Sequence, residues 1–314
     1  MSPAEADPGP RTTGASPFAG SIVALPTPFA HDAVDLAALD RLVQHQTAAR
    51  THGVTVGGTT GEGWSLNLDE TVQITSRVVA AAGRPSGREL HVVGQVTEVD
   101  SRRAAQLAEQ MVHSGVEGLL VGVPPLVQPG EVGVLRHLER VFERLPWTVP
   151  VALLNEPSRT GTDLTIEITE RASREFEFVC AHCEGVGFPG RARRLARDSF
   201  LDVLSGDDRM LGPYLRSGAI GAVNVVGNLV PGEVRALFES GDDERDSRER
   251  ALGPLIDALR AGPHPVPLKE TLGLLGAIDC EVRAPLVPLG ATELGELRTV
   301  LELARLLVPE RAHG

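Results

Sequence analysis

Short runs of β-branched and other apolar residues alternate along the chain with longer segments whose apolar residues recur every three or four positions. From Ser21 onward the alternation repeats at intervals of roughly 25 to 35 residues, which is typical of successive strand and helix pairs. Apolar strands separated by helices indicate a parallel sheet covered by helices, and eight such units favour a closed (β/α)8 TIM barrel over an open sheet. The predicted strands are SIVALPTPF, GVTVGG, ELHVVGQV, GLLVGV, VPVALLN, FVCAHC, FLDVLSG and GAVNVV.

The two ends of the chain differ from this pattern. Residues 1–17 are rich in Pro, Ala, Ser and Gly, so we predict a disordered N-terminal lead. Residues 18–230 contain the strand and helix pairs and are predicted to form the barrel. From 231 to 314 only helical patterns follow, which predicts a C-terminal helical domain.

Composition excludes several classes of function. The 314 residues carry a formal net charge of −12, which disfavours binding to nucleic acid. Three cysteines are too few for a disulfide framework, and no apolar stretch is long enough to cross a membrane, so we expect a cytoplasmic protein. Only one of the 30 basic residues is a lysine, Lys269. Chemistry that needs a side-chain amine therefore has a single candidate.

In barrels of this kind the functional site lies where the strands end and loops begin. GGTTGEG, residues 57–63, follows the second strand; its glycines permit close approach of a ligand, and the Thr59 and Thr60 hydroxyls suit a carboxylate. A tight turn with a helix cap is the alternative. NEPSRTG, residues 155–161, follows the fifth strand and offers Arg159, whose guanidinium suits a carboxylate unless it is only a surface residue.

The sixth strand ends in an unusual group, because FVCAHCEGVG places Cys180, His182 and Cys183 within four positions. Alternate residues of a strand point to opposite faces, so this spacing is poor for zinc and we predict no metal site. A cysteine in a strand more often packs as a small hydrophobic residue than acts as a nucleophile.

Several motifs in register resemble the pyruvate-dependent aldolase family of dihydrodipicolinate synthase and N-acetylneuraminate lyase. The resemblance covers nearly all of residues 18–310. It implies a (β/α)8 barrel with a helical C-terminal domain, usually a homotetramer without a cofactor. It also implies a lysine on strand six that forms a Schiff base with pyruvate or a related 2-oxo acid. The motifs, in family order, are FAGSIVALPTPF, GGTTGEGWSLNLDE, LLNEPSRTGTDL, LSGDD, GAVNVVGN and HPVPLKETLGLLG.

The resemblance assigns roles to four residues. Thr59 and Thr60 match the hydroxyl pair that contacts the pyruvate carboxylate and relays protons. Arg159 matches the arginine that holds the carboxylate of the second substrate in the synthase. Val223 matches the small apolar residue whose backbone lines the pyruvate pocket.

The sequence departs from the family at its tyrosines. Leu154 stands where the family has its catalytic tyrosine. Pro125 and Leu126 replace a tyrosine pair, one member of which reaches the site of a neighbouring subunit. The only tyrosine, Tyr214, falls in a predicted helix. We predict a pocket shaped by Leu154 and Leu126 in place of the tyrosines.

The strand-six lysine is also absent. Counting from NEPSRTG without a gap puts His182 at its position, whereas the acid and glycines that follow put Cys183 there. We favour Cys183, because one extra residue in the preceding loop costs little. Only one of the two can face the barrel interior, and neither can form an iminium. Lys269 does not match the Schiff-base position.

Two interpretations follow. The first is a lyase or aldolase-like enzyme with altered chemistry, in which Cys183 acts as a nucleophile, His182 as a general base, or Thr60 relays protons. The second is a non-catalytic homologue that binds a 2-oxo acid or has a structural or regulatory role. Both predict a small carboxylate or 2-oxo acid as the ligand and a homo-oligomer, either a dimer or a tetramer.

Overall fold

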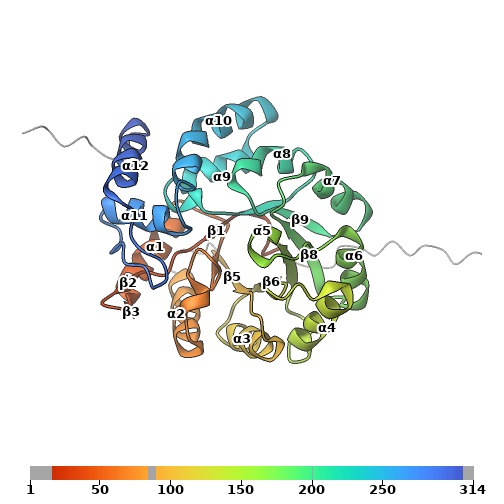
Figure 1. The fold of residues 1–314 in the computed structure, drawn as a ribbon. Helices are drawn as coiled ribbons and strands as arrows, with labels where there is room; N and C mark the ends of the chain where they lie inside the picture. The colour runs from red at the N-terminus through yellow and green to blue at the C-terminus, as the bar shows by residue number, and fades with distance from the viewer. Residues whose placement is uncertain (1–15, 84–89, 200, 307–314) are drawn as a thin grey trace, which may run out of the picture.

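The structure is a computed structural model that describes residues 16–83, 90–199 and 201–306. Eight parallel strands close into a barrel, each lying between its neighbours in the chain (Figure 1). This confirms the predicted (β/α)8 architecture. Of the predicted disordered lead, residues 1–15 lie outside the described residues. The strands are β1 (Gly20–Ala24), β4 (Gly53–Val56), β5 (His91–Val96), β6 (Gly118–Gly122), β7 (Val151–Asn155), β8 (Val179–Glu184), β9 (Asp202–Ser205) and β10 (Gly221–Asn224).

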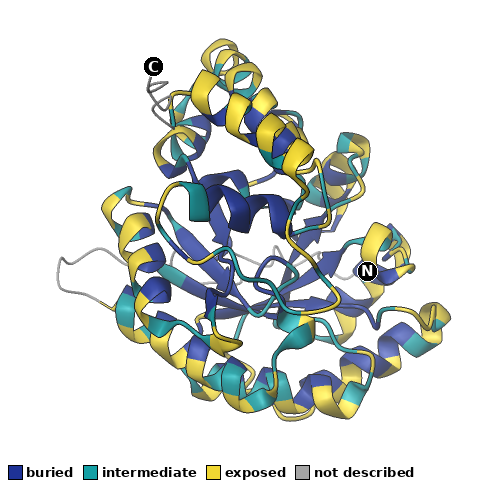
Figure 2. Ribbon diagram, turned by 60° about the vertical axis from the view of Figure 1, so that its left-hand side comes forward, coloured by how far each residue is buried: buried dark blue, intermediate teal, exposed yellow. Residues whose placement is uncertain are grey.

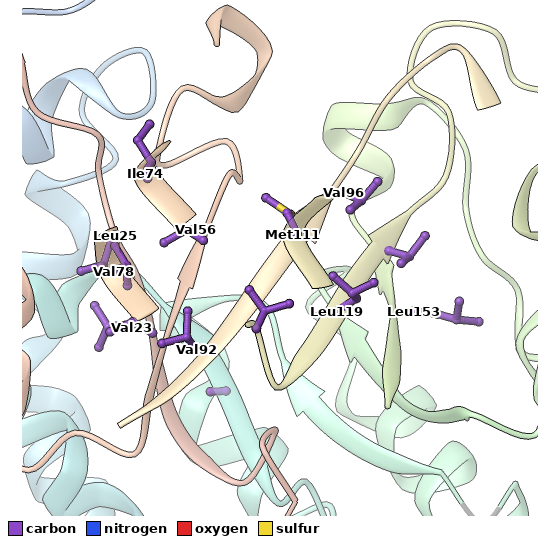
Figure 3. Packing of buried hydrophobic residues seen from close by; sticks show 14 of the residues in the cluster. Val23, Leu25, Val56, Ile74, Val78, Val92, Val96, Met111, Leu119 and Leu153 are labelled. Atoms are coloured by element: carbon purple, nitrogen blue, oxygen red, sulfur yellow. The ribbon is translucent and has the colours of Figure 1, made fainter. Parts of the chain in front are cut away.

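The strands are apolar on both faces because each face is buried in a different cluster. Ile22 and Leu120 belong to the cluster inside the barrel, whereas the adjacent Val23 and Leu119 belong to the larger cluster between strands and helices. Figure 3 shows part of this outer cluster, where Met111 of a covering helix packs near Leu119. Alternation along each strand therefore fills two cores at once.

Helices follow the strands and surround the barrel, with buried residues on their inner faces and exposed residues on their outer faces (Figure 2). Polar side chains fix where several begin: Asp35 and Asp100 accept hydrogen bonds from the first N–H groups of α1 and α3, and Asn67 forms a capping box with Glu70 at α2. The helices up to residue 239 are α1 (Leu36–Ala48), α2 (Leu68–Ala82), α3 (Ser101–His113), α4 (Gly130–Phe142), α5 (Pro157–Thr160), α6 (Ile166–Glu175), α7 (Pro189–Asp198), α8 (Leu211–Leu215) and α9 (Pro231–Glu239).

Three further helices follow: α10 (Asp242–Ala258), α11 (Val266–Leu274) and α12 (Ala291–Leu303). In Figure 1, α11 lies between α12 and the region of α1 and the hairpin of β2 (Phe29–Ala30) and β3 (Ala33–Val34). Arg283, after α11, donates hydrogen bonds to Glu70 of α2 and to the carbonyl of Asp32. These bonds connect the segment after α11 to α2 and to the β2–β3 hairpin. The domain boundaries that we placed at residues 17 and 230 remain predictions.

No helix within the described ranges combines the length and apolarity needed to cross a membrane. A cytoplasmic location remains a prediction.

Candidate functional site

A cavity of about 290 Å³ opens at the carboxyl ends of the barrel strands. The strand ends and their loops form its wall, and the segment between α10 and α11 covers it from the other side. This is the position at which TIM barrels carry their sites. Its principal lining residues are Thr59, Thr60, Gln95, Leu154, Glu156, Arg159, Cys183, Asp207, Asp208, Val223, Arg260 and His264.

The end of β8 directs Cys183 into this cavity and His182 away from it. Cys183 packs in the inner cluster, and its Sγ lies 3.3 Å from the point that a Cβ on Gly206 would occupy. His182 is fully buried on the opposite face, where Nε2 lies 3.2 Å from Glu184 Oε2 and Nδ1 lies 3.4 Å from Thr169 Oγ1 of α6. The pocket-facing position therefore belongs to Cys183, and His182 is not placed to act as a general base there.

The surroundings of Cys183 keep it a neutral thiol. Burial raises its pKa well above the usual value, and the charges of Glu156 and Glu184 raise it further. Because the thiolate is the nucleophilic form, this environment opposes activation. The geometry therefore does not favour the nucleophile hypothesis.

The loop after β4 brings Thr59 and Thr60 to the cavity. The loop is tight enough to need glycine, since a Cβ on Gly63 would stand 2.0 Å from the carbonyl oxygen of Gly57. Thr60 Oγ1 lies 3.0 Å from Nε2 of His264, a residue from the segment that covers the cavity. Sequence reasoning missed this contact.

His264 is a hydrogen-bonding group here and not a charged one. Burial lowers its pKa to about 3, and the nearby charges of Arg159 and Arg260 act in the same direction. At neutral pH the imidazole is therefore uncharged, and its role is to orient the Thr60 hydroxyl.

The turn after β7 contributes Arg159, as predicted from its motif, and also Glu156, which we did not predict. Arg159 Nε lies 3.6 Å from Glu156 Oε1, and the side chains are 40% and 22% exposed. Burial raises the pKa of Glu156, and the charge of Arg159 opposes the rise. The signal in the sequence was a charged residue directly after an apolar strand.

Two more carboxyl groups line the cavity from the loop after β9. Asp207 Oδ1 accepts a hydrogen bond of 3.0 Å from Nη1 of Arg260. Asp208 accepts hydrogen bonds from the backbone N–H groups of Val225 and Val226. Burial raises the pKa of Asp208 to about 6. The LSGDD motif, which begins in the last two residues of the seventh barrel strand, was the sequence signal for both carboxylates.

The two leucines at the family tyrosine positions lie in different surroundings. Leu154 lines the cavity next to Cys183 on the neighbouring strand. Leu126 is 83% exposed and is not among the lining residues, so it does not shape the pocket of this chain as we predicted. Tyr214 is fully buried in α8 among residues outside the barrel interior.

The single lysine lies away from the cavity lining. Lys269, in α11, is fully buried, and its Nζ lies 2.5 Å from Oε1 of Glu62 and 4.2 Å from the centre of the Phe29 ring. The other oxygen of Glu62 accepts a hydrogen bond from the backbone N–H of Arg283. This amine therefore joins α11 to the loop after β4.

Metal ligands do not gather at the site. Within the described part of the chain, no group of three or more His, Cys, Asp or Glu side chains is arranged to hold a metal ion.

Residues 17–304 match the sequence profile of the Dihydrodipicolinate synthetase family. The chain belongs to this family. It is 32% identical over 291 residues to the 4-hydroxy-tetrahydrodipicolinate synthase of Pelobacter propionicus, covering 91% of this chain and 98% of that one.

Solved structures of dihydrodipicolinate synthases share the fold. The Aquifex aeolicus synthase superposes with a TM-score of 0.87 at 30% identity, covering 93% of this chain and 100% of that chain. A chloride-inhibited synthase of Acinetobacter baumannii, complexed with pyruvate, superposes with a TM-score of 0.86 at 26% identity, covering 92% and 100%. The family resemblance noted in the sequence is thus confirmed.

Proposed function

We propose that this member of the dihydrodipicolinate synthetase family binds a small 2-oxo acid, or a related carboxylate, without forming a Schiff base. One observation carries the proposal: the pocket-facing residue at the end of β8 is Cys183, a buried thiol. A Schiff base requires an amine. The one side-chain amine, on Lys269, is bound to Glu62 outside the cavity lining.

The ligand class follows from the groups that remain. Thr59, Thr60, Arg159 and Val223 all line the same cavity. A guanidinium and hydroxyl groups are suited to a carboxylate, and the cavity of about 290 Å³ suits a small molecule. The pyruvate complex of the Acinetobacter baumannii relative supports the same class of ligand. A homo-oligomer, dimer or tetramer, remains our expectation.

The absent amine also bears on catalysis. An iminium is the electron sink that stabilises a carbanion next to the former carbonyl, and a neutral thiol cannot replace it. We therefore propose non-covalent binding of the 2-oxo acid as the function. A lyase or aldolase-like reaction requires another group in the cavity to carry it.

Borohydride reduction in the presence of pyruvate, followed by intact-mass measurement, tests the absence of a Schiff base. We expect an unchanged mass, and a stable adduct would contradict the proposal.

Calorimetry with a panel of 2-oxo acids tests binding. Arg159→Ala should weaken the affinity by about tenfold or more, since a charge-assisted hydrogen bond contributes about 1.5–3 kcal/mol. Arg136→Ala, at an exposed position on α4, is the matched control and should leave affinity unchanged. If no member of the panel binds, the proposal is wrong.

A further inference from the structure

Glu156 is the acidic side chain of the cavity that has the fewest polar partners. Asp207 is engaged by Arg260, and Asp208 by two backbone N–H groups. The Glu156 carboxylate forms no hydrogen bond with the described residues, and its nearest cation, Arg159, is 3.6 Å away. That separation is longer than a hydrogen bond. Glu156 is therefore ion-paired with Arg159, but its carboxylate oxygens accept no hydrogen bond from the described residues and can accept one from a ligand.

Its position brings it against whatever enters the cavity. Glu156 lines both the main cavity and an adjoining one of about 210 Å³, and the two share Leu154 and Arg159. Gly185 makes room for it, because a Cβ there would stand 3.3 Å from Glu156 Cγ. Its charge also reaches Cys183, whose pKa it raises. Glu156 and Cys183, which stands at the position of the family lysine, therefore line the same cavity.

We propose that Glu156 transfers protons to and from the carbon next to the carbonyl of a bound 2-oxo acid, so that the site enolises its ligand without covalent attachment. This inference rests on the function proposed above. The bond from that carbon to hydrogen breaks, and the proton moves to the Glu156 carboxylate. The electron pair forms the carbon–carbon double bond, and the negative charge moves to the carbonyl oxygen. Return of a proton from Glu156 restores the 2-oxo acid, so no other reactant is consumed.

The surroundings supply what such a step needs. Arg159, near Glu156, offers a positive charge for the developing enolate oxygen. With His264 as the Nε2–H tautomer, the ring donates to Thr60 Oγ1 and leaves the hydroxyl hydrogen for the enolate oxygen. Burial raises the pKa of Glu156, which makes its carboxylate a stronger base than an exposed one. An arginine stabilises an enolate less than an iminium would, so we expect a slow reaction.

Hydrogen–deuterium exchange of pyruvate tests the inference. The methyl signal of pyruvate is followed by proton NMR in D2O with phosphate buffer, because amine buffers catalyse exchange themselves. The full chain should accelerate exchange above the protein-free rate. Glu156→Gln should lower this acceleration by about 100-fold, the typical contribution of a general base, while calorimetry shows retained binding of pyruvate.

Two further variants serve as controls for the Glu156→Gln measurement. Glu139→Gln alters an exposed glutamate on α4 and should leave exchange unchanged. Glu156→Asp keeps the carboxylate but withdraws it by one methylene, so it should retain only part of the rate. If circular dichroism shows that both Glu156 variants fail to fold, the pH dependence of the wild-type exchange rate tests the role of Glu156. The rate should rise with pH as a single group loses its proton and then become constant.

The outcomes separate this inference from the proposed function. Pyruvate binding without exchange, or equal exchange by wild type and Glu156→Gln, overturns only the role of Glu156, and so does a pH-independent rate. Exchange accompanied by an adduct trapped with borohydride overturns both, because the reaction then runs through an imine. Absence of exchange, together with no binding of any 2-oxo acid of the panel, also overturns both.

Discussion

Two buried regions of this protein differ in what they provide for Schiff-base chemistry. At the end of β8, Cys183 faces the cavity but has no cation to offset its burial, so it stays a neutral thiol. Between α11 and the loop after β4, Lys269 has a carboxylate partner, Glu62, but no access to the cavity. The residue at the first site faces the cavity but is not an amine, whereas the amine at the second site does not reach the cavity.

The difference shows that residue type alone does not decide chemistry. An amine becomes a nucleophile only where a carbonyl can reach it, and Lys269 is fully buried. Its role is to hold the loop that carries Thr59 and Thr60.

Cys183→Lys should have the largest effect, because it puts an amine where the cavity has access. We expect a change from no borohydride-trapped pyruvate adduct to about one adduct per chain, measured by intact mass. His182→Lys is the matched control and should give none, since that side chain faces away from the cavity. A folded Cys183→Lys protein without adduct would show that the absent amine is not what prevents Schiff-base formation.

Lys269→Met should destabilise the fold by about 3–5 kcal/mol, because it leaves the buried Glu62 carboxylate unpaired. Urea denaturation followed by circular dichroism measures the free energy of unfolding. The double variant with Glu62→Gln removes both charges and should lose less. A loss below about 1 kcal/mol for the single variant would mean that the pair does not hold this region together.

The smallest expected effect is the dependence of the free energy of unfolding on pH that Asp208 causes. Its pKa is raised from 3.8 to about 6 by burial, so the folded protein retains a proton that the unfolded chain loses between these values. The stability contributed by the protonated group is fully present below about pH 4. It falls by about 1.4 kcal/mol per pH unit as pH rises toward 6, and then stays constant.

Asp208→Asn should remove that slope. Urea unfolding of both proteins from pH 4 to 7 provides the comparison, in which the contributions of all other groups cancel. Parallel stability curves for the two proteins would contradict the assignment.

Much of the fold was predictable, because strand and helix periods are local properties of the chain. The eight apolar runs became the eight barrel strands. Sites in such barrels lie at the carboxyl ends of the strands, and this rule predicted the common location of four residues. The residues that line the one cavity are Thr59, Thr60, Arg159 and Val223. The prediction for Leu126 was wrong because its loop turns the side chain toward solvent.

The orientation of β8 was harder, because a slip of one residue exchanges the two faces of a strand. The pairing of β7 with β8 shifts register between Val151 and Ala152, and beyond the shift Leu154 pairs with Cys183. The sequence left His182 and Cys183 as alternatives for this reason. Pairing with the neighbouring strand decided between them.

The pattern of apolar runs and strand-end motifs was enough to predict the barrel, the position of the site and a sixth barrel strand without lysine. The partners that complete the site depend on contacts between segments that are far apart in the chain. Thr60 meets His264 across 204 residues, and Glu62 meets Lys269 across 207. No local pattern encodes such contacts, because they arise only when barrel closure brings the segment after α10 over the strand ends. Glu156 and Arg159, in contrast, are three residues apart in one turn, so their ion pair is local.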